Sequence, residues 1–410
     1  MIPVANKRKI INDPVYGFIT IPDERCFDVI EHPFFQRLRR IKQLGLTHLV
    51  YPGALHTRFH HALGAMHLMG QALQVLRNKG VEITPAESQA AVLAILMHDL
   101  GHGPFSHALE TTLVKGTMHE EITDLFMESL NQEFRGELGL SLAMFRGTYS
   151  RKFFHSLISG QLDMDRLDYL RRDSFFTGVS EGLIGSERII KMLNVEGDDL
   201  VVEEKGMLSV EHFLSARRIM YWQVYLHKTV LAAETLLIQI LTRARYLALQ
   251  GQELFATPHF LRFLGNDYTR MDFEQDPGLL ASFARIDDFD VFSSVKAWTE
   301  HPDAILSRLS RYLVDRKLFR IRFPNRPATD EIVRQHALEA EQNLGLSPGD
   351  GQWFVYTGEV EATAYDTGAG PIMVKTLSGV KEIATLLPSL GMPFSSEPVK
   401  RYYLCLSKEY

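Results

Sequence analysis

The apolar residues of this chain recur mainly three and four positions apart, which is the spacing of α-helices. This pattern predicts helices at about residues 23–44, 58–79, 85–97, 119–130 and 210–250, with several more between 257 and 315. Pro33 is expected to begin the second of two helices in the first segment, because proline suits the first helical turn. A mainly α-helical fold follows.

Short alternating or turn-bounded stretches predict a few β-strands. They lie at residues 9–22, 195–210, 318–323, 353–356, 359–365, 372–376 and 399–406. Pro324 and Pro327 mark a boundary, and helices at 329–344 and 380–387 accompany the last strands. We therefore expect a helical domain with small β-hairpins over residues 1–325 and a small α+β unit over residues 326–410.

The composition describes an ordinary globular protein. Of 410 residues, 45% are hydrophobic and 23% are charged. The chain contains no run of about 18 apolar residues, so the sequence predicts no membrane span. The N-terminus lacks the apolar stretch of a signal peptide. The two cysteines, Cys26 and Cys405, are far apart and follow no metal spacing, so we expect a reducing, cytoplasmic location.

The net charge of −6 argues against nonspecific binding to nucleic acid, because such proteins are usually basic. One local cluster of residues is basic, although the chain as a whole is negative. It consists of Arg37, Arg39, Arg40 and Lys42. Two interpretations stay open for it, a phosphate-binding site and a solvated helix face.

The helix predicted at 85–97 is apolar on most faces from Ala90 onward and ends at His98 and Asp99. Thr84 and Glu87 have the spacing of a capping box at its start. A buried, ionised aspartate is costly unless a cation or hydrogen bonds compensate it. The pair therefore favours a metal site over simple packing.

A glycine-broken loop with two further histidines, His102 and His107, follows this pair. Two imidazoles and two carboxylates suit Mn²⁺, Fe²⁺, Co²⁺, Ni²⁺ or Zn²⁺. The spacing does not identify the distant ligands, for which His61 and Asp165 are the best candidates. A metal lowers the pKa of bound water, and nearby histidines can protonate a leaving oxygen, so the pattern indicates hydrolysis of a phosphate ester or anhydride.

The segment that holds Asp165 is rich in carboxylates and has helical spacing through Asp168 to Arg172. Histidines elsewhere are weaker signals. Taken singly, His56, His60 and His67 are interpreted as packed side chains.

Three strings of residues resemble the HD phosphohydrolase superfamily. They span Arg58–Gly64, His98–His107 and Asp163–Tyr169. The chain most closely resembles the deoxynucleoside triphosphate (dNTP) triphosphohydrolases of the SAM-and-HD-domain type and their bacterial relatives, without the SAM domain. The resemblance runs from about residue 9 to residue 321.

The resemblance implies a set of site residues. One transition metal would be held by His61, His98, Asp99 and Asp165. Catalytic or phosphate-facing roles fall on His102, His107 and His119, with Glu110 as an acidic partner. Substrate contacts are implied at Gln43, Leu44, Arg58, Arg166, Tyr169, Asp173, Arg217 and Tyr225. An activator site between subunits would use Lys9, Asn12, Asp13, Glu31, Gln36, Arg39, Arg316 and Arg320.

The activity that this resemblance implies is metal-dependent hydrolysis of dNTPs to the deoxynucleoside and inorganic triphosphate. Mg²⁺ would accompany the triphosphate, and dimers or tetramers would bind an activating nucleotide between subunits. Two alternatives stay open. One is an HD phosphohydrolase acting on nucleoside monophosphates or signalling nucleotides. The other is a nucleotide-binding regulator or nucleic-acid-binding protein that keeps the fold, against which the intact ligand set argues.

Overall fold

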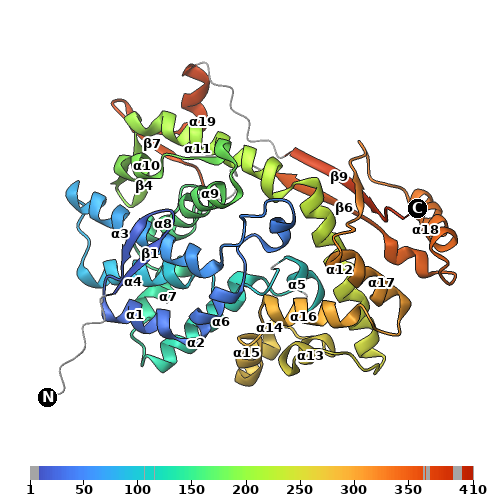
Figure 1. Ribbon diagram of the computed structural model, residues 1–410. Helices are drawn as coiled ribbons and strands as arrows, with labels where there is room; N and C mark the ends of the chain where they lie inside the picture. Colours follow the sequence, from blue (N-terminus) through green and yellow to red (C-terminus); the bar gives the residue numbers. More distant parts are fainter. Residues whose placement is uncertain are drawn as a thin grey trace.

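Helices make up most of the fold, as the apolar spacing predicts (Figure 1). The structure is a computed structural model that describes residues 9–105, 107–114, 116–362, 365, 370–390 and 399–409, without the side chains of His107, Glu110, Ser389 and Leu390. The helices are α1 Glu24–Glu31, α2 Pro33–Gln36, α3 Arg58–Asn78, α4 Pro85–Met97, α5 His107–Thr112, α6 His119–Glu133, α7 Gly139–Phe145, α8 Lys152–Ile158, α9 Met164–Thr177, α10 Ser186–Met192, α11 Met207–Met220, α12 Lys228–Leu249, α13 Pro258–Leu264, α14 Arg270–Gln275, α15 Pro277–Phe283, α16 Asp288–Trp298, α17 Ala304–Val314, α18 Asp330–Leu344 and α19 Ile383–Leu386.

The strands are short and form three small sheets. They are β1 Ile10–Asp13, β2 Gly17–Thr20, β3 Leu193–Glu196, β4 Asp199–Glu203, β5 Arg320–Arg322, β6 Val355–Ala362, β7 Met373–Thr376, β8 Gly379–Glu382 and β9 Val399–Leu406. The sheet orders are β1-β2, β3-β4-β7-β8 and β5-β9-β6. The fold class, a mainly helical protein with small sheets, is confirmed.

The core of the site is a layer in which α3 packs against both α4 and α9. Helix α4 is buried along all of Ala90–Met97, so its C-terminal end lies inside the protein. Its predicted capping box is present, because the Glu87 carboxylate accepts a hydrogen bond from the Thr84 N–H at 2.8 Å and the Thr84 hydroxyl accepts from the Glu87 N–H at 3.2 Å.

A glycine sets the close approach of α3 to α9. A Cβ atom on Gly64 would overlap the carboxylate of Asp168 and the guanidinium of Arg172. Only glycine therefore leaves room for these two side chains of α9 to reach the face of α3.

The second N-terminal helix is shorter than the pattern predicts. It is α2 followed by a 3₁₀ turn at Arg37–Arg40, after which Ile41 is extended. The Ile41 carbonyl accepts a hydrogen bond from the Arg58 N–H at 3.0 Å, and Lys42 pairs with Thr57. Pairing with the start of α3 is therefore what ends the helix, and it brings Gln43 beside the site.

The prediction of a single helix over residues 210–250 is wrong. Helix α11 is followed by a π-helical turn at Tyr221–Tyr225, and α12 then starts after His227, whose side chain caps the Thr229 N–H at 3.2 Å. The two halves, Glu204–Tyr225 and Lys228–Leu249, meet at 54°. Within the described ranges no helix alone has the length and hydrophobicity for a membrane crossing, and only these two halves together pass that test.

Strands on both sides of the predicted boundary pair with one another. Strand β7 pairs in parallel with β4, and β5 joins β9, so the C-terminal strands occupy two places in Figure 1. The prediction of a helix over residues 380–387 is partly wrong. Gly379–Glu382 form β8 against β7, and helical structure begins with α19 and continues as a 3₁₀ turn at Leu387–Leu390. The division at residue 325 stays a prediction.

Candidate metal centre

His61, His98 and Asp99 lie together at the junction of α3 and the end of α4. One ligand atom from each residue lies within 4.8 Å of the others. The two histidines approach most closely, with 3.2 Å between their Nε2 atoms. Asp165, from the first turn of α9, places Oδ1 3.1 Å from Nε2 of His61 and 3.5 Å from Nε2 of His98. The structure thus brings together all four side chains that the sequence selects as metal ligands.

The two imidazoles present their Nε2 atoms to the same point because their Nδ1 atoms are engaged elsewhere. Nδ1 of His61 lies 2.8 Å from Oδ2 of Asp168, and Nδ1 of His98 lies 2.6 Å from the carbonyl oxygen of Ile95. Hydrogen bonds of this kind fix the ring orientation and tautomer of metal-binding histidines. The donor set of two nitrogens and two carboxylates fits a divalent transition metal.

Asp99 also contacts two residues outside the candidate ligand set, Arg58 and His102. Its Oδ2 accepts a hydrogen bond from Nη1 of Arg58 at 2.7 Å, and its Oδ1 lies 3.2 Å from Nε2 of His102. Burial raises the pKa of Asp99, but the charges of Arg58 and the neighbouring histidines hold it well below its usual range. The carboxylate is therefore ionised, as a metal ligand has to be.

Burial and neighbouring charged groups also shift the pKa values of His61 and His102. Burial lowers the pKa of His61, yet hydrogen bonds to the carboxylates of Asp165 and Asp168 outweigh it and raise the value to about 10. A metal ion bound there would displace a proton from this ring. For His102, burial and the charge of Arg58 lower the pKa to about 3. His102 is therefore a neutral imidazole at pH 7 in this state.

His102 stacks on a second predicted catalytic residue, His119. Their ring centroids are 3.8 Å apart with an interplanar angle of 21°. Gly101 permits this contact, since a Cβ atom there would overlap the carbonyl oxygen of His119. The side chains of His107 and Glu110, which the sequence also selects, lie outside the described residues.

The side chains of the basic cluster of the first helices all make contacts within the protein. Arg37 is fully buried and donates to the carbonyl oxygens of Leu100, His102 and Ile286. Arg40 pairs with Asp287 and Lys42 with Asp288, while Arg39 bonds Gln36 and lies over the Phe59 ring. Neither interpretation of the sequence predicts the role of Arg37, which holds the loop that carries His102.

Three of the predicted substrate residues, Asp173, Tyr225 and Tyr169, form a run of contacts that reaches His61. Asp173 accepts a hydrogen bond from the Tyr225 hydroxyl at 2.8 Å and lies 2.7 Å from Nε2 of the buried His56. The centroid of the Tyr169 ring lies 6.2 Å from that of Tyr225 and 6.4 Å from that of His61. The break after α11 is what brings Tyr225 to α9.

Other predicted contacts are engaged within the protein. The guanidinium of Arg166 donates to the Asp163 carboxylate and the Gly160 carbonyl oxygen. Arg217 lies 5.7 Å from the Tyr221 ring. Leu44 is half-buried, and the side-chain oxygen of Gln43 is buried with no hydrogen-bond partner among the described residues.

The residues of the predicted activator site fall in two parts of the fold. Lys9 and Asn12 lie at the β1–β2 hairpin, near Glu31, Gln36 and Arg39 in sequence. Arg316 donates to the Leu49 carbonyl oxygen at 2.9 Å, and Arg320 is exposed on β5. Their role stays a prediction.

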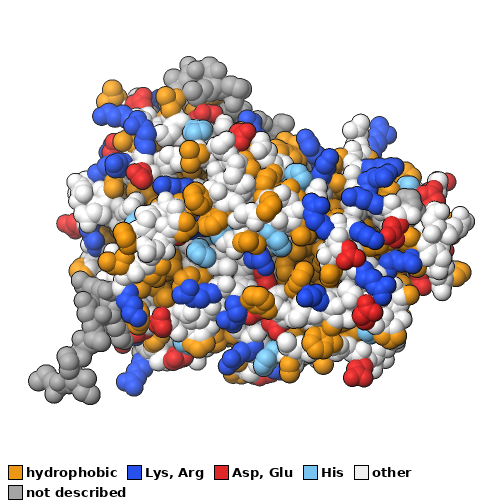
Figure 2. Space-filling model, viewed as in Figure 1, with side chains coloured by type: hydrophobic (Ala, Val, Ile, Leu, Met, Phe, Trp, Pro, Cys, Tyr) orange, Lys and Arg blue, Asp and Glu red, His pale blue; other side chains and the backbone are white. Residues whose placement is uncertain are grey.

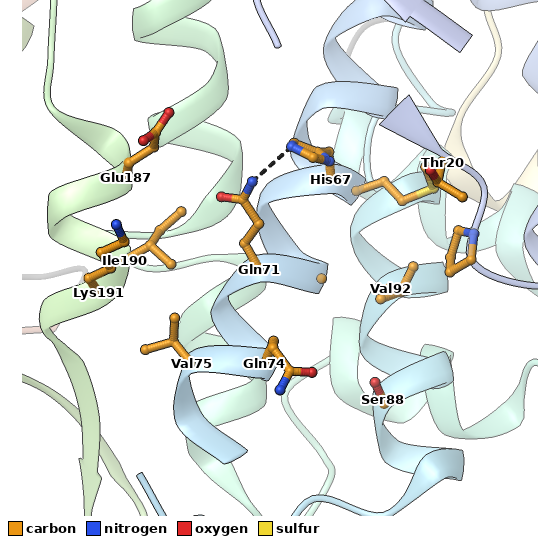
Figure 3. Close-up of a pocket in the computed structure, with 13 residues that line it drawn as sticks. Thr20, His67, Gln71, Gln74, Val75, Ser88, Val92, Glu187, Ile190 and Lys191 are labelled. Carbon is orange, nitrogen blue, oxygen red and sulfur yellow. Dashed lines mark hydrogen bonds between the residues drawn. The ribbon is translucent and has the colours of Figure 1, made fainter. Parts of the chain in front are cut away.

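One of the grooves formed by the described residues lies apart from this site. It has a volume of about 610 Å³ and lies between α3, α4 and α10 (Figure 3). His67 and Gln71 face it and share a contact of 2.9 Å, and Glu187 stands across from them. None of the predicted catalytic, substrate or metal residues lines it. On the face shown in Figure 2, basic and acidic side chains are interspersed.

Comparison with known proteins identifies the family. Residues 58–143 match the model of the HD domain, and residues 184–254 match that of the HD associated region. The uncharacterized protein YwfO of Bacillus subtilis is 35% identical over 325 residues, which cover 77% of this chain and 72% of that protein. A crystal structure described as a phosphohydrolase from Bacteroides thetaiotaomicron is 48% identical, with a TM-score of 0.93 over 98% of this chain and 100% of that one. The chain belongs to the HD-domain phosphohydrolase family.

This family assignment agrees with the metal centre, because the HD domain implies a divalent metal. One further relative of this HD phosphohydrolase carries a specific activity in its name. A deoxynucleoside triphosphate triphosphohydrolase, the SAMHD1 homolog of Dictyostelium discoideum, is 28% identical over 290 residues. That match covers 66% of this chain and 56% of the relative.

Proposed function

We propose that this HD phosphohydrolase hydrolyses dNTPs to the deoxynucleoside and inorganic triphosphate. One divalent transition metal (Mn, Fe, Co, Ni or Zn) would be held by His61, His98, Asp99 and Asp165. The observation that carries the proposal is the surroundings of Asp99. An anion-binding arginine, Arg58, and a proton-transfer candidate, His102, both contact this carboxylate, at 2.7 Å and 3.2 Å. The name of the Dictyostelium relative supports dNTPs as the substrate class.

The ion would supply Lewis-acid chemistry, polarising a phosphoryl group and activating water. The protein side chains would bind the substrate and supply the proton for the leaving oxygen. In the overall reaction, water adds to the α-phosphorus, the bond from that phosphorus to the 5′-oxygen breaks, and the 5′-oxygen takes up a proton. Arg58 would bind phosphate oxygens, and Mg²⁺ would neutralise the rest of the triphosphate charge.

Of the candidates whose side chains are described, His102 is the best-placed proton donor for the leaving oxygen, with His119 stacked against it. Its low pKa rises when negative charge is brought close, because a nearby anion favours the imidazolium. A bound triphosphate is such a charge. The imidazole that is neutral before binding would then be protonated when the leaving oxygen needs a proton.

Gln43, Tyr169, Asp173 and Tyr225 would hold the sugar. The buried, unpaired oxygen of Gln43 can accept a hydrogen bond from a ligand hydroxyl. The Tyr169 and Tyr225 rings meet at an interplanar angle of 78°. They would form an apolar wall, which suits a deoxyribose carbon better than a hydroxyl. We further propose homo-oligomers that bind an activating nucleotide at the residues around Lys9, Asn12 and Arg39.

A panel of dNTPs with product analysis tests the proposal. Purified protein with Mn²⁺ and Mg²⁺ is expected to release inorganic triphosphate and the free deoxynucleoside. Release of phosphate, pyrophosphate or a monophosphate product alone would assign the enzyme to another phosphohydrolase class. Adding dGTP to a dATP assay should raise the rate and enlarge the oligomer, and no change in either would remove the activator from the proposal.

A further inference from the structure

The predicted metal ligand His61 is one end of a buried chain of ionic contacts. Its Nδ1 contacts Oδ2 of Asp168 at 2.8 Å. Both oxygens of Asp168 accept from Arg172, at 2.9 Å from Nε and 3.0 Å from Nη2. Arg172 in turn donates from Nη1 to Oδ2 of Asp13 at 2.7 Å. The chain of contacts therefore runs from α3 through α9 to the last residue of β1.

These charges are removed from water. Asp168 and Arg172 are fully buried, and Asp13 is 6% exposed. Breaking a buried ion pair by removing one partner is costly, because the other charge is left uncompensated. Arg172 thus needs Asp13 to stay between the two carboxylates, and Asp168 needs Arg172 to keep its orientation toward His61.

Asp13 also holds the turn of its own hairpin. Its Oδ1 accepts from the N–H groups of Val15 and Tyr16 at 2.9 Å and 3.0 Å. The Tyr16 ring lies over the Arg172 guanidinium, 5.5 Å from its central carbon. The same carboxylate therefore determines the shape of the β1–β2 turn and the position of Arg172.

We infer that Asp13 and Arg172 are positioning residues for His61, so that the β1–β2 hairpin sets the affinity of the metal centre. The inference rests on the metal centre of the proposed function. Neither residue contacts the metal-binding point; each acts through Asp168. A displacement of the hairpin that draws Asp13 from Arg172 loosens His61 and weakens the binding of the ion.

The test is titration of Co²⁺ into metal-free full-length protein, read by its visible absorption, without any nucleotide. Asp13→Asn keeps the size of the side chain and removes its charge. We expect it to weaken Co²⁺ binding by about tenfold and to alter the absorption band, since partners behind metal ligands contribute about 10–100-fold to affinity. Asp13→Glu should restore part of the affinity, and Arg172→Lys should weaken it, because lysine cannot bridge two carboxylates in this way.

The matched control is Asp303→Asn, which removes a half-buried ion pair with Arg243 that lies outside this chain of contacts. It should lower the melting temperature comparably and leave the Co²⁺ affinity and spectrum unchanged. Wild-type affinity and spectrum in a folded Asp13→Asn protein would overturn the inference and leave the proposed function intact. If the wild-type protein does not bind Co²⁺, the metal centre itself is wrong, and the inference falls with it. Both readouts are independent of which nucleotide is hydrolysed.

Discussion

The guanidinium of Arg37 donates a hydrogen bond to the carbonyl oxygen of His102 at 2.5 Å. It also donates to Leu100 in the same loop and to Ile286, which precedes α16. The central carbon of the group lies 5.7 Å from the centroid of the Phe126 ring and 5.2 Å from that of Phe283. Burial lowers the pKa of Arg37 to about 9, so the side chain is still charged at pH 7. One cation thus fixes the backbone on which His102 is carried.

Replacing Arg37 by lysine should impair turnover more than metal binding. Lysine has no planar fork, so it cannot satisfy three carbonyl oxygens in different directions. We expect a loss of about 2–4 kcal/mol in stability from the unpaired buried groups. Chemical denaturation, kcat and metal content measure the three effects. Arg40→Lys is the control, because Arg40 is half-exposed and pairs with Asp287 alone. Equal kcat in the two variants would contradict this role for Arg37.

Asp165→Ala should remove metal and activity together. Its carboxylate approaches both histidines, and its pKa is depressed because hydrogen bonds from His61 and His98 outweigh the effect of burial. Metal analysis after dialysis, alongside the hydrolysis assay, provides the measurement. Glu253→Ala is a suitable control, since Glu253 lies at an exposed loop position. An Asp165→Ala protein with a full complement of metal would exclude Asp165 from the ligand set.

His102→Ala should keep the metal and slow the chemical step. The imidazole contacts Asp99 but lies outside the cluster formed by His61, His98 and Asp99. Loss of a general acid or base costs about 10²–10⁴-fold in rate. The comparison of kcat with metal content separates the two roles. A metal-free His102→Ala protein would instead make His102 a ligand.

The end of α4 is the part of the site that the sequence predicts best. A capping box, a continuously apolar segment and a glycine-broken loop are all local signals, and they locate His98 and Asp99 without a structure. Part of the chain of contacts from His61 through Asp168 to Arg172 can also be predicted from the sequence. Asp168 and Arg172 are four residues apart on one helix, which is the spacing of an ion pair.

The contacts that position these groups were not visible, because they join distant parts of the chain. Arg37 and Ile286 are 249 positions apart, and Asp13 and Arg172 are 159 apart. Apolar spacing describes only the few residues of one element. The break at Tyr221–Tyr225 could not be predicted for the same reason. Residues 210–250 contain neither glycine nor proline, so no local signal marks the end of a helix there. The contact of Tyr225 with Asp173 joins residues far apart in the sequence.

Glu234 on α12 gives a prediction for stability that is independent of the site. Burial alone raises the pKa of its carboxyl group from 4.5 to about 7. No hydrogen bond to this carboxylate is found among the described residues of α12 and its neighbours. The folded protein therefore binds the proton more tightly than the unfolded chain does. The free energy of unfolding should fall as the pH rises from about 4.5 to about 7, and should then level off.

Glu234→Gln removes this dependence, because the amide carries no charge at any pH. At pH 8 the variant should be more stable than the wild type, by at most about 3 kcal/mol. At pH 4 the two proteins should have nearly equal stability, since the wild-type carboxyl group is then neutral as well. Urea denaturation at both pH values measures the difference. Glu253→Gln, at an exposed loop position, should show no such dependence. A Glu234→Gln protein that gains nothing between pH 4 and pH 8 would show that Glu234 is ionised in the folded protein at no cost.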